Sequence, residues 1–359
     1  MPTNSCCKKY TETQKSGSFF KKSEKGVALP VSPVIVHTIQ NFLGKVLNNF
    51  AGVIHMKKTI IAAAVAAAVA APAAFADVKI SGLVHMSVTD VNTSTLANAS
   101  DVNDNVSRIV FSGSEDLGNG MKAAFKIEDR INMDTGDAGT GDGRETYGEL
   151  AGDFGSLKFG RMYGPTKRVV SMAEQAGDTA IDITTMAGTN EITNDGTVYY
   201  TSPNFNGLTV TAALSGAGTA NTDIGDNTDI SVTYSNNGLS VGVASYSDDV
   251  TGTNDQTAVA VKYSMGDFTV AVSQQETDTT TSTEMKQATA ASVSMKMGSN
   301  TIIAQYGEKE LKSGTTTDGW GLAVVHSMSK QTAVYAGLRD SDVAGDLDTA
   351  VALGLKHSF

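Results

Sequence analysis

Apolar residues stand at every second position in many short runs of this chain. Val78, Ile80, Val84, Met86 and Val88 alternate with polar residues, and the pattern recurs at 123–127 and 351–359. A period of two places successive side chains on opposite faces of a β-strand. No run within 77–359 comes near 18 apolar residues, so the sequence predicts no transmembrane helix there. The dominant predicted element is a short strand with one apolar face.

Short turns rich in Gly, Asn, Asp or Ser separate these alternating runs. The predicted turns are 114–119, 152–156, 202–207, 235–238, 264–267, 298–300 and 327–330. The connections on the other side are longer and polar: 89–106, 129–143, 162–196, 215–228, 247–256, 275–286, 307–318 and 340–348. Seven hairpins and the two unpaired runs at 78–88 and 349–359 make sixteen strands.

The contrast between short turns and long loops is typical of outer-membrane barrels, which also favour an even number of strands. Lipid offers no hydrogen bonds, so a sheet in a membrane must close on itself. We therefore predict an all-β fold, a 16-stranded antiparallel transmembrane β-barrel with short periplasmic turns and long external loops. A soluble β-sandwich stays open as an alternative, because alternation does not tell whether the apolar face meets protein or lipid.

The first 76 residues differ from the rest. Residues 56–76 combine two lysines after Met56, a short run of Ala, Val and Ile, and small residues before Asp77. These are the parts of a secretory signal peptide, cleaved between Ala76 and Asp77. The apolar run is short for a spanning anchor helix, which is the alternative. Residues 1–55 are interpreted as an upstream, non-structural leader or, alternatively, a cytoplasmic extension, and 77–359 as the barrel domain.

Charge and composition exclude several functions for residues 77–359. The first 76 residues hold nine of the chain's 27 basic and two of its 38 acidic residues, so 77–359 carries a net charge of −18. Both cysteines also lie before residue 77, so no cysteine-based metal site is expected. No basic patch suggests nucleic acid. Three scattered histidines and no Gly-x-Ser-x-Gly element predict no catalytic site, and we expect no cofactor and no metal.

Several segments resemble the general porins of Gram-negative outer membranes. They are SRIVFSGSEDLGNG at 107–120, RETYGELAGDFGSLKFGR at 144–161, YTSPNFNGL at 200–208 and LKHSF at 355–359. The resemblance spans 77–359 and implies a homotrimer of barrels. It also implies that the third loop, here 162–196, folds into the lumen. Phe359 fits the terminal signal that the barrel-assembly machinery reads in that family.

The resemblance also implies a charged constriction in the lumen. Arg108 and Arg144 match positions of the family's basic ladder, and Lys126 and Arg130 have the parity opposite to the apolar residues of their strand, so they should point inward. The loop acids expected to face this ladder are Glu174, Asp178 and Asp182. Each charge has an alternative role as a solvated lumen residue or as a salt bridge that fixes the loop.

We therefore expect an outer-membrane porin for passive diffusion of small hydrophilic solutes and ions. Leu83 and Thr201 stand where some members carry Lys and Arg, and this thinner basic ladder predicts a preference for cations. A substrate-specific channel of the same fold and a structural or adhesive barrel are alternatives. The other expected partners are outer-membrane lipid and lipopolysaccharide. Aromatic residues near strand ends predict interface girdles: Tyr234, Tyr246, Tyr263, Phe268, Tyr306, Trp320 and Tyr335.

Overall fold

A computed structural model of the protein describes residues 77–92, 99–138, 143–179, 181–182, 193–216, 223–248, 255–342 and 349–359. All of them belong to one compact unit, Ala71–Phe359. The predicted leader, signal peptide and cleavage position before Asp77 lie outside the described residues, except that Asp77 itself is the first residue of β1.

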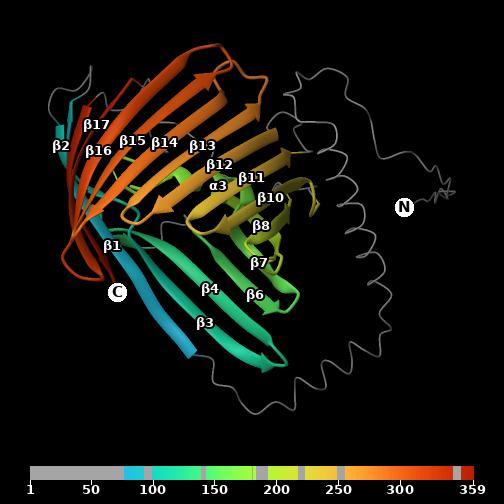
Figure 1. Ribbon diagram of the computed structural model, residues 1–359. Coiled ribbons are helices and arrows are strands. Elements are labelled where there is room, and N and C mark those ends of the chain that lie inside the picture. The colour runs from blue at the N-terminus through green and yellow to red at the C-terminus, as the bar shows by residue number, and fades with distance from the viewer. Residues whose placement is uncertain are drawn as a thin grey trace, which may run out of the picture. The chain divides into compact units, whose positions relative to one another are not determined.

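The unit is a closed antiparallel sheet (Figure 1). Its strands are β1 (Asp77–Asn92), β2 (Ala99–Asp104), β3 (Arg108–Gly118), β4 (Met121–Asn132), β5 (Asp137–Ala138), β6 (Thr146–Gly152), β7 (Gly155–Tyr163), β8 (Thr193–Thr201), β9 (Leu208–Ser215), β10 (Asn227–Asn236), β11 (Leu239–Asp248), β12 (Asp255–Met265), β13 (Phe268–Asp278), β14 (Met285–Met297), β15 (Asn300–Leu311), β16 (Thr316–Ser327), β17 (Thr332–Ser341) and β18 (Thr349–Ser358). From β6 to β18 each strand pairs with its chain neighbour, β4 pairs with β3 and β6, and β1 pairs with β18 to close the ring.

The barrel has sixteen strands when β2 and β3 are counted as one strand and the short β5 is left out. This confirms the predicted number. β2 and β3 are one strand interrupted at 105–107, because both pair with the same side of β1. The two-residue β5 pairs only with β4. The predicted turn at 114–119 begins too early, since β3 continues to Gly118. The tight turn there is Asn119–Gly120, where both residues adopt the left-handed backbone that Asn and Gly tolerate best.

The last residue of the chain completes the closure. The backbone N–H of Phe359 donates to the Gly82 carbonyl over 3.1 Å, and the Gly82 N–H donates to the Phe359 carbonyl over 3.0 Å. A Cβ at Gly82 would stand only 2.5 Å from the Arg108 carbonyl oxygen and 2.5 Å from the Phe359 ring, so β1 carries a glycine here. Phe359 therefore extends the seam between the first and last strands.

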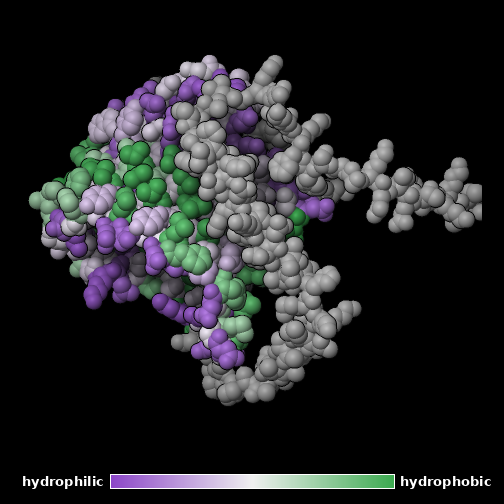
Figure 2. All heavy atoms as spheres, turned by 45° about the vertical axis from the view of Figure 1, so that its right-hand side comes forward, coloured by the Kyte–Doolittle hydropathy of each residue, from purple (hydrophilic) through white to green (hydrophobic). Residues whose placement is uncertain are grey.

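The outer face of the barrel is apolar, and the inner face is polar or small. Large apolar side chains such as Val243, Val261 and Leu353 are exposed on the outside, where they would meet lipid. Figure 2 shows hydrophobic residues gathered across the middle of the visible face, with hydrophilic residues above and below them. The girdle prediction was wrong for Tyr246 and Tyr335, whose side chains are buried on the lumen side at 8% and 6% exposure.

The connection between β7 and β8 enters the barrel, which confirms the predicted inward-folded third loop (Figure 1). It begins with helix α3 (Pro165–Val170) and the 3-10 turn η1 (Ser171–Ala173). Helix α3 packs against β9 to β13, and η1 packs against β12 to β14. Within the described ranges, neither this helix nor any other is long and apolar enough to cross a membrane.

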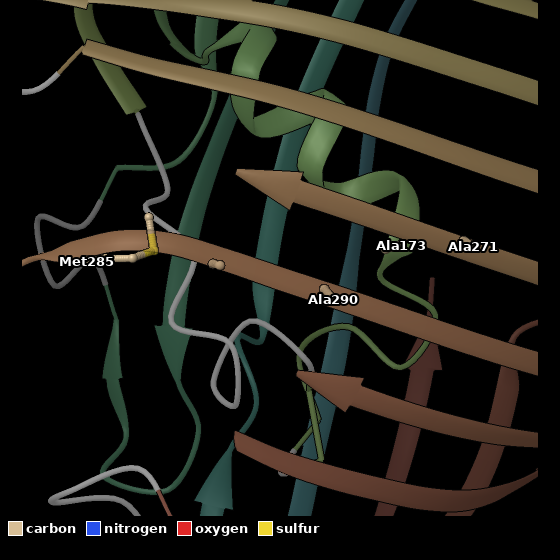
Figure 3. Packing of buried hydrophobic residues seen from close by; sticks show 5 residues of the cluster. Ala173, Ala271, Met285 and Ala290 are labelled. Atoms are coloured by element: carbon tan, nitrogen blue, oxygen red, sulfur yellow. The ribbon is translucent and has the colours of Figure 1, made fainter. Parts of the chain in front are cut away.

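The loop lies on a part of the barrel wall that is built from small side chains. We call it the small-residue wall: Gly242, Ala244, Ala258, Ala260, Ala271, Ala288, Ala290 and Ala323, on β11 to β14 and β16. Figure 3 shows Ala173 of the loop beside Ala271 and Ala290. A Cβ at Gly242 would come within 2.9 Å of Met172 and 3.0 Å of Val169. The loop backbone can therefore approach this wall closely.

Candidate pore constriction

A second part of the wall faces the loop across the lumen and carries charges. We call it the charged wall: Arg108, Lys126, Glu128, Arg130, Arg144 and Glu145, from β3, β4 and the residues just before β6. On β4 the charged residues Lys126, Glu128 and Arg130 alternate with Ile127, which is exposed on the outer face. The period of two of the strand therefore places the three charges on one face, toward the lumen.

Glu128 is the centre of the charged wall. Its carboxylate lies 2.6 Å from Lys126 Nζ, 2.6 Å from Arg144 Nε and 3.4 Å from Arg108 Nε. The residue is 6% exposed, so these contacts are shielded from bulk water. One carboxylate thus holds three cations side by side, which keeps their mutual repulsion from spreading them apart.

Two ion pairs join the charged wall to the loop. Arg108 donates to Asp178 Oδ2 over 3.0 Å, and Arg168 of α3 donates to Glu145. Glu145 also accepts from Lys126 Nζ over 3.0 Å. Burial alone would raise the pKa of Glu145, but the charges of Arg168 and Lys126 outweigh it and hold the pKa below its usual value. The loop is therefore tied to the wall both at its start and near residue 178.

The other predicted constriction residues also lie near the lumen. Asp182 is buried at 5% exposure and accepts the backbone N–H of Asp178 over 2.7 Å, so it shapes the turn that presents Asp178. Glu174 ends η1. Arg130 is 3.7 Å from Asp104, a loose ion pair. The structure thus brings Arg108, Lys126 and Arg144 together through Glu128, while Arg130 lies beside Asp104.

A cavity of about 860 Å³ lies between the loop and the wall. The basic residues that line it are Arg130, Arg144, Lys167, Arg168 and Lys356, and the acidic ones are Asp104, Glu174, Asp178 and Asp182. Tyr163 is the platform for two of the cations, with Lys167 Nζ 3.9 Å and Arg144 Cζ 5.5 Å from its ring centre. The arrangement is a cavity lined by charges of both signs. It can orient polar solutes and disfavour apolar ones.

Four residues of this network are not among the constriction residues predicted from the sequence. Glu128 shares the parity of Lys126 and Arg130, so the same alternation could have found it. Glu145 follows Arg144 directly and accepts a hydrogen bond from Lys126 on β4. No local sequence pattern reveals this contact. Lys167 and Arg168 are cations on the loop, where only acids were predicted. Their inward direction comes from the packing of α3 and is invisible in the sequence.

Neither a metal nor a catalytic group emerges from this network. In the part of the chain that the structure describes, no group of three or more His, Cys, Asp or Glu side chains could hold a metal ion. The charged side chains pair with one another beside the cavity of about 860 Å³. Such a site can filter and orient what passes through it.

A closed membrane-type barrel with a loop folded inside and a charged passage defines the class of outer-membrane diffusion channels. The Gram-negative porin family matches residues 62–346, and the chain belongs to this family. Its members are channel proteins and not enzymes. They lie in the outer membrane of Gram-negative bacteria, and this protein is an outer-membrane protein as well.

Three relatives illustrate the likeness. Outer membrane porin protein 32 of Delftia acidovorans is 28% identical over 358 residues, which cover 85% of this chain and 100% of that protein. The anion-selective porin from Comamonas acidovorans superposes with a TM-score of 0.68 at 22% identity, over 79% of this chain and 100% of that chain. A trimer form of OmpT from Vibrio cholerae has a TM-score of 0.58 at 16% identity, over 79% and 99% of the chains. The two structural likenesses support the fold alone.

Proposed function

We propose that the barrel is a passive diffusion channel for small hydrophilic solutes and ions, with its constriction between the third loop and the charged wall. The observation that carries the proposal is the charged cavity of about 860 Å³ inside a closed barrel. Arg130 and Arg144 line the cavity on the side of the charged wall, with Arg108 and Lys126 joined to Arg144 through Glu128, and Glu174, Asp178 and Asp182 are its acidic loop residues. Lys167 and Arg168 add two cations on the loop itself.

The channel is proposed to be only weakly selective, with a preference for cations. The net charge of −18 in residues 77–359 attracts cations, and exposed acids such as Asp255, Asp278 and Asp318 lie at the external strand ends. The lining of the cavity weakly opposes the preference for cations, because it has five basic and four acidic side chains. The relative from Comamonas acidovorans is anion-selective, so the sign of the selectivity is the sharpest test.

The experiment is single-channel recording in a planar bilayer, with protein purified from outer membranes. Open steps and a reversal potential that favours cations support the proposal. The preference should weaken from about 0.1 M to about 1 M salt, because the Debye length falls from about 10 Å to about 3 Å and screens the exposed mouths first. A reversal potential that favours anions at both concentrations would overturn the cation preference. A silent membrane would point to a structural or adhesive barrel, and saturation by one solute would point to a substrate-specific channel.

The assembly and export of the protein follow as parts of the same proposal. A homotrimer is supported by the trimer form of the OmpT relative, and channels that close in three equal steps would reveal it. Residues 56–76 act as a signal peptide, so mass spectrometry of the outer-membrane protein should find Asp77 at the N-terminus. Phe359, at the seam with Gly82, is proposed to be read by the barrel-assembly machinery, and lipid and lipopolysaccharide surround the barrel. Detecting the peptide that precedes Asp77 in the assembled protein would refute the cleavage.

A further inference from the structure

Asp229 is a buried carboxylate on the lumen side of β10, outside the charged network of the constriction. It is 1% exposed, and the residues paired beside it are Ala213 on β9 and Tyr246 on β11. Burying a carboxylate is costly unless hydrogen bonds compensate it. On β11 to β14, the residues that contact the loop are mostly alanine, glycine and serine. A carboxylate at this place therefore requires a specific partner.

That partner is Thr166, the second residue of α3. The Thr166 backbone N–H lies 3.0 Å and 3.1 Å from the two carboxylate oxygens of Asp229, and the Thr166 hydroxyl donates to Asp229 Oδ1 over 2.6 Å. Thr166 itself is fully buried. The helix has no side-chain cap of its own, because Gly164 precedes it, and Pro165 contributes no N–H. Asp229 thus caps the helix from the barrel wall.

This contact fixes the residues that enter the pore. Lys167 and Arg168 directly follow Thr166 in the same helical turn, and both line the cavity. On the other side of the helix, Val169 and Val170 pack on Ala244, Ala258 and Ala260. Apolar packing is not directional and tolerates sliding along a flat surface, whereas hydrogen bonds to a fixed carboxylate define one position.

We propose that Asp229 is a positioning residue for permeation: through Thr166 it sets where α3, and with it Lys167 and Arg168, stand in the pore. The role rests on the proposed channel function and deepens it, because Asp229 lies outside the cavity lining and acts only through the helix. The small-residue wall is the surface on which the loop packs, and Asp229 fixes the position of the loop on that surface.

A graded set of variants tests the proposal. Asp229→Ala removes all three hydrogen bonds, Asp229→Asn keeps the size but replaces one accepting oxygen by an NH₂ group, and Thr166→Val removes only the hydroxyl. Losing hydrogen bonds to a charged group should raise the population of displaced loop positions by about one to two orders of magnitude. Recordings should show brief conductance changes most often for Asp229→Ala, less often for Asp229→Asn and Thr166→Val, and at the parent frequency for Thr166→Ser.

A second readout reports loop position without needing conduction. Residues 77–359 contain no cysteine, so Ser171→Cys, at the cavity lining, gives one reporter thiol once Cys6 and Cys7 are replaced by serine. Its rate of modification by a cationic thiol reagent should change several-fold in Asp229→Ala. Ser231→Ala, two residues along on the same face of β10, is the matched control and should leave it unchanged.

The outcomes separate the two proposals. If the parent protein forms no channel, the proposed function fails, and the thiol readout still decides the role of Asp229. If folded Asp229→Ala, Asp229→Asn and Thr166→Val all match the parent and Ser231→Ala in both readouts, Asp229 does not position the helix. If Asp229→Ala alone fails to fold, the two variants that preserve side-chain volume still decide.

Discussion

The two sides of the lumen that meet the third loop differ in almost every property. The small-residue wall offers Ala244, Ala260 and Ala290, which are nearly inaccessible and make only van der Waals contact with the loop. The charged wall offers Arg108 and Glu145, which reach the loop through ion pairs beside the cavity.

The difference explains how a loop can narrow a barrel without blocking it. A wide barrel cannot be filled by its own side chains. Burying Val169 and Val170 against small residues contributes about 1.5–3 kcal/mol each and keeps the loop on one side. On the other side, charged groups retain water because dehydrating them is costly. The passage therefore stays between the loop and the charged wall.

The strongest test of this comparison fills the small-residue wall. Ala260 is 1% exposed and packs against the valines of α3, so Ala260→Trp should displace the helix toward the charged wall. We expect a large loss of single-channel conductance and a loss of stability of about 1–3 kcal/mol from overpacking. Conductance steps and thermal unfolding measure the two effects. Val261→Trp, next along β12 but exposed outward at 43%, is the control and should change neither. Equal conductance in both variants would show that the wall does not place the loop.

A second test removes the centre of the charged wall. Glu128→Gln leaves Arg108, Lys126 and Arg144 without the carboxylate that they share, so the selectivity should move toward anions. A unit charge about 4 Å from a passing ion in water is worth about 1 kcal/mol, so we expect a change of at least about fivefold in the permeability ratio. Reversal potentials measure it. Glu149→Gln removes the same charge on the lumen side of β6, outside the ion pairs of Glu128, and should have the smaller effect.

The two walls were not equally predictable from the sequence. Strict alternation along β4 predicts that Lys126 and Arg130 face inward, and the structure places Lys126 beside Glu128 and Arg130 beside Asp104. The same parity would have assigned Tyr246 and Tyr335 to the lumen, where aromatic type alone suggested a girdle. The direction of Lys167 and Arg168 and the pairing of Asp229 with Thr166 depend on tertiary packing of an irregular loop. No local period describes such packing, so the strand number was predictable and the loop contacts were not.

A third test separates the two charges of one contact. Arg108→Ala should increase cation preference, and Asp178→Asn should decrease it, because each removes one member of the 3.0 Å pair from the lumen. Both side chains are partly exposed, at 23% and 29%, so their coupling should be only about 0.2–1 kcal/mol. The double variant should therefore lie near the parent in reversal potential. Shifts of the same sign in both single variants would contradict opposed charges at this contact.

The smallest effect concerns pH and the link between α3 and the charged wall. The pKa of Glu145 is held below its ordinary value of 4.5 by Arg168 and Lys126, despite the opposing effect of burial. A carboxyl whose pKa is lower in the folded state contributes stability that is complete above its unfolded pKa and is lost as the pH falls through its folded pKa. Conductance should thus be steady from neutral pH to about 5 and become noisy only below the ordinary carboxyl range, when Glu145 is protonated and Arg168 is released. Glu145→Gln should be noisy already at neutral pH and insensitive to further acidification at this contact. The opposite result would be a parent channel whose conductance noise changes between pH 7 and pH 5 while that of Glu145→Gln does not. Glu145 would then titrate in its ordinary range or above. The charged wall would not hold the helix as the ion pairs indicate.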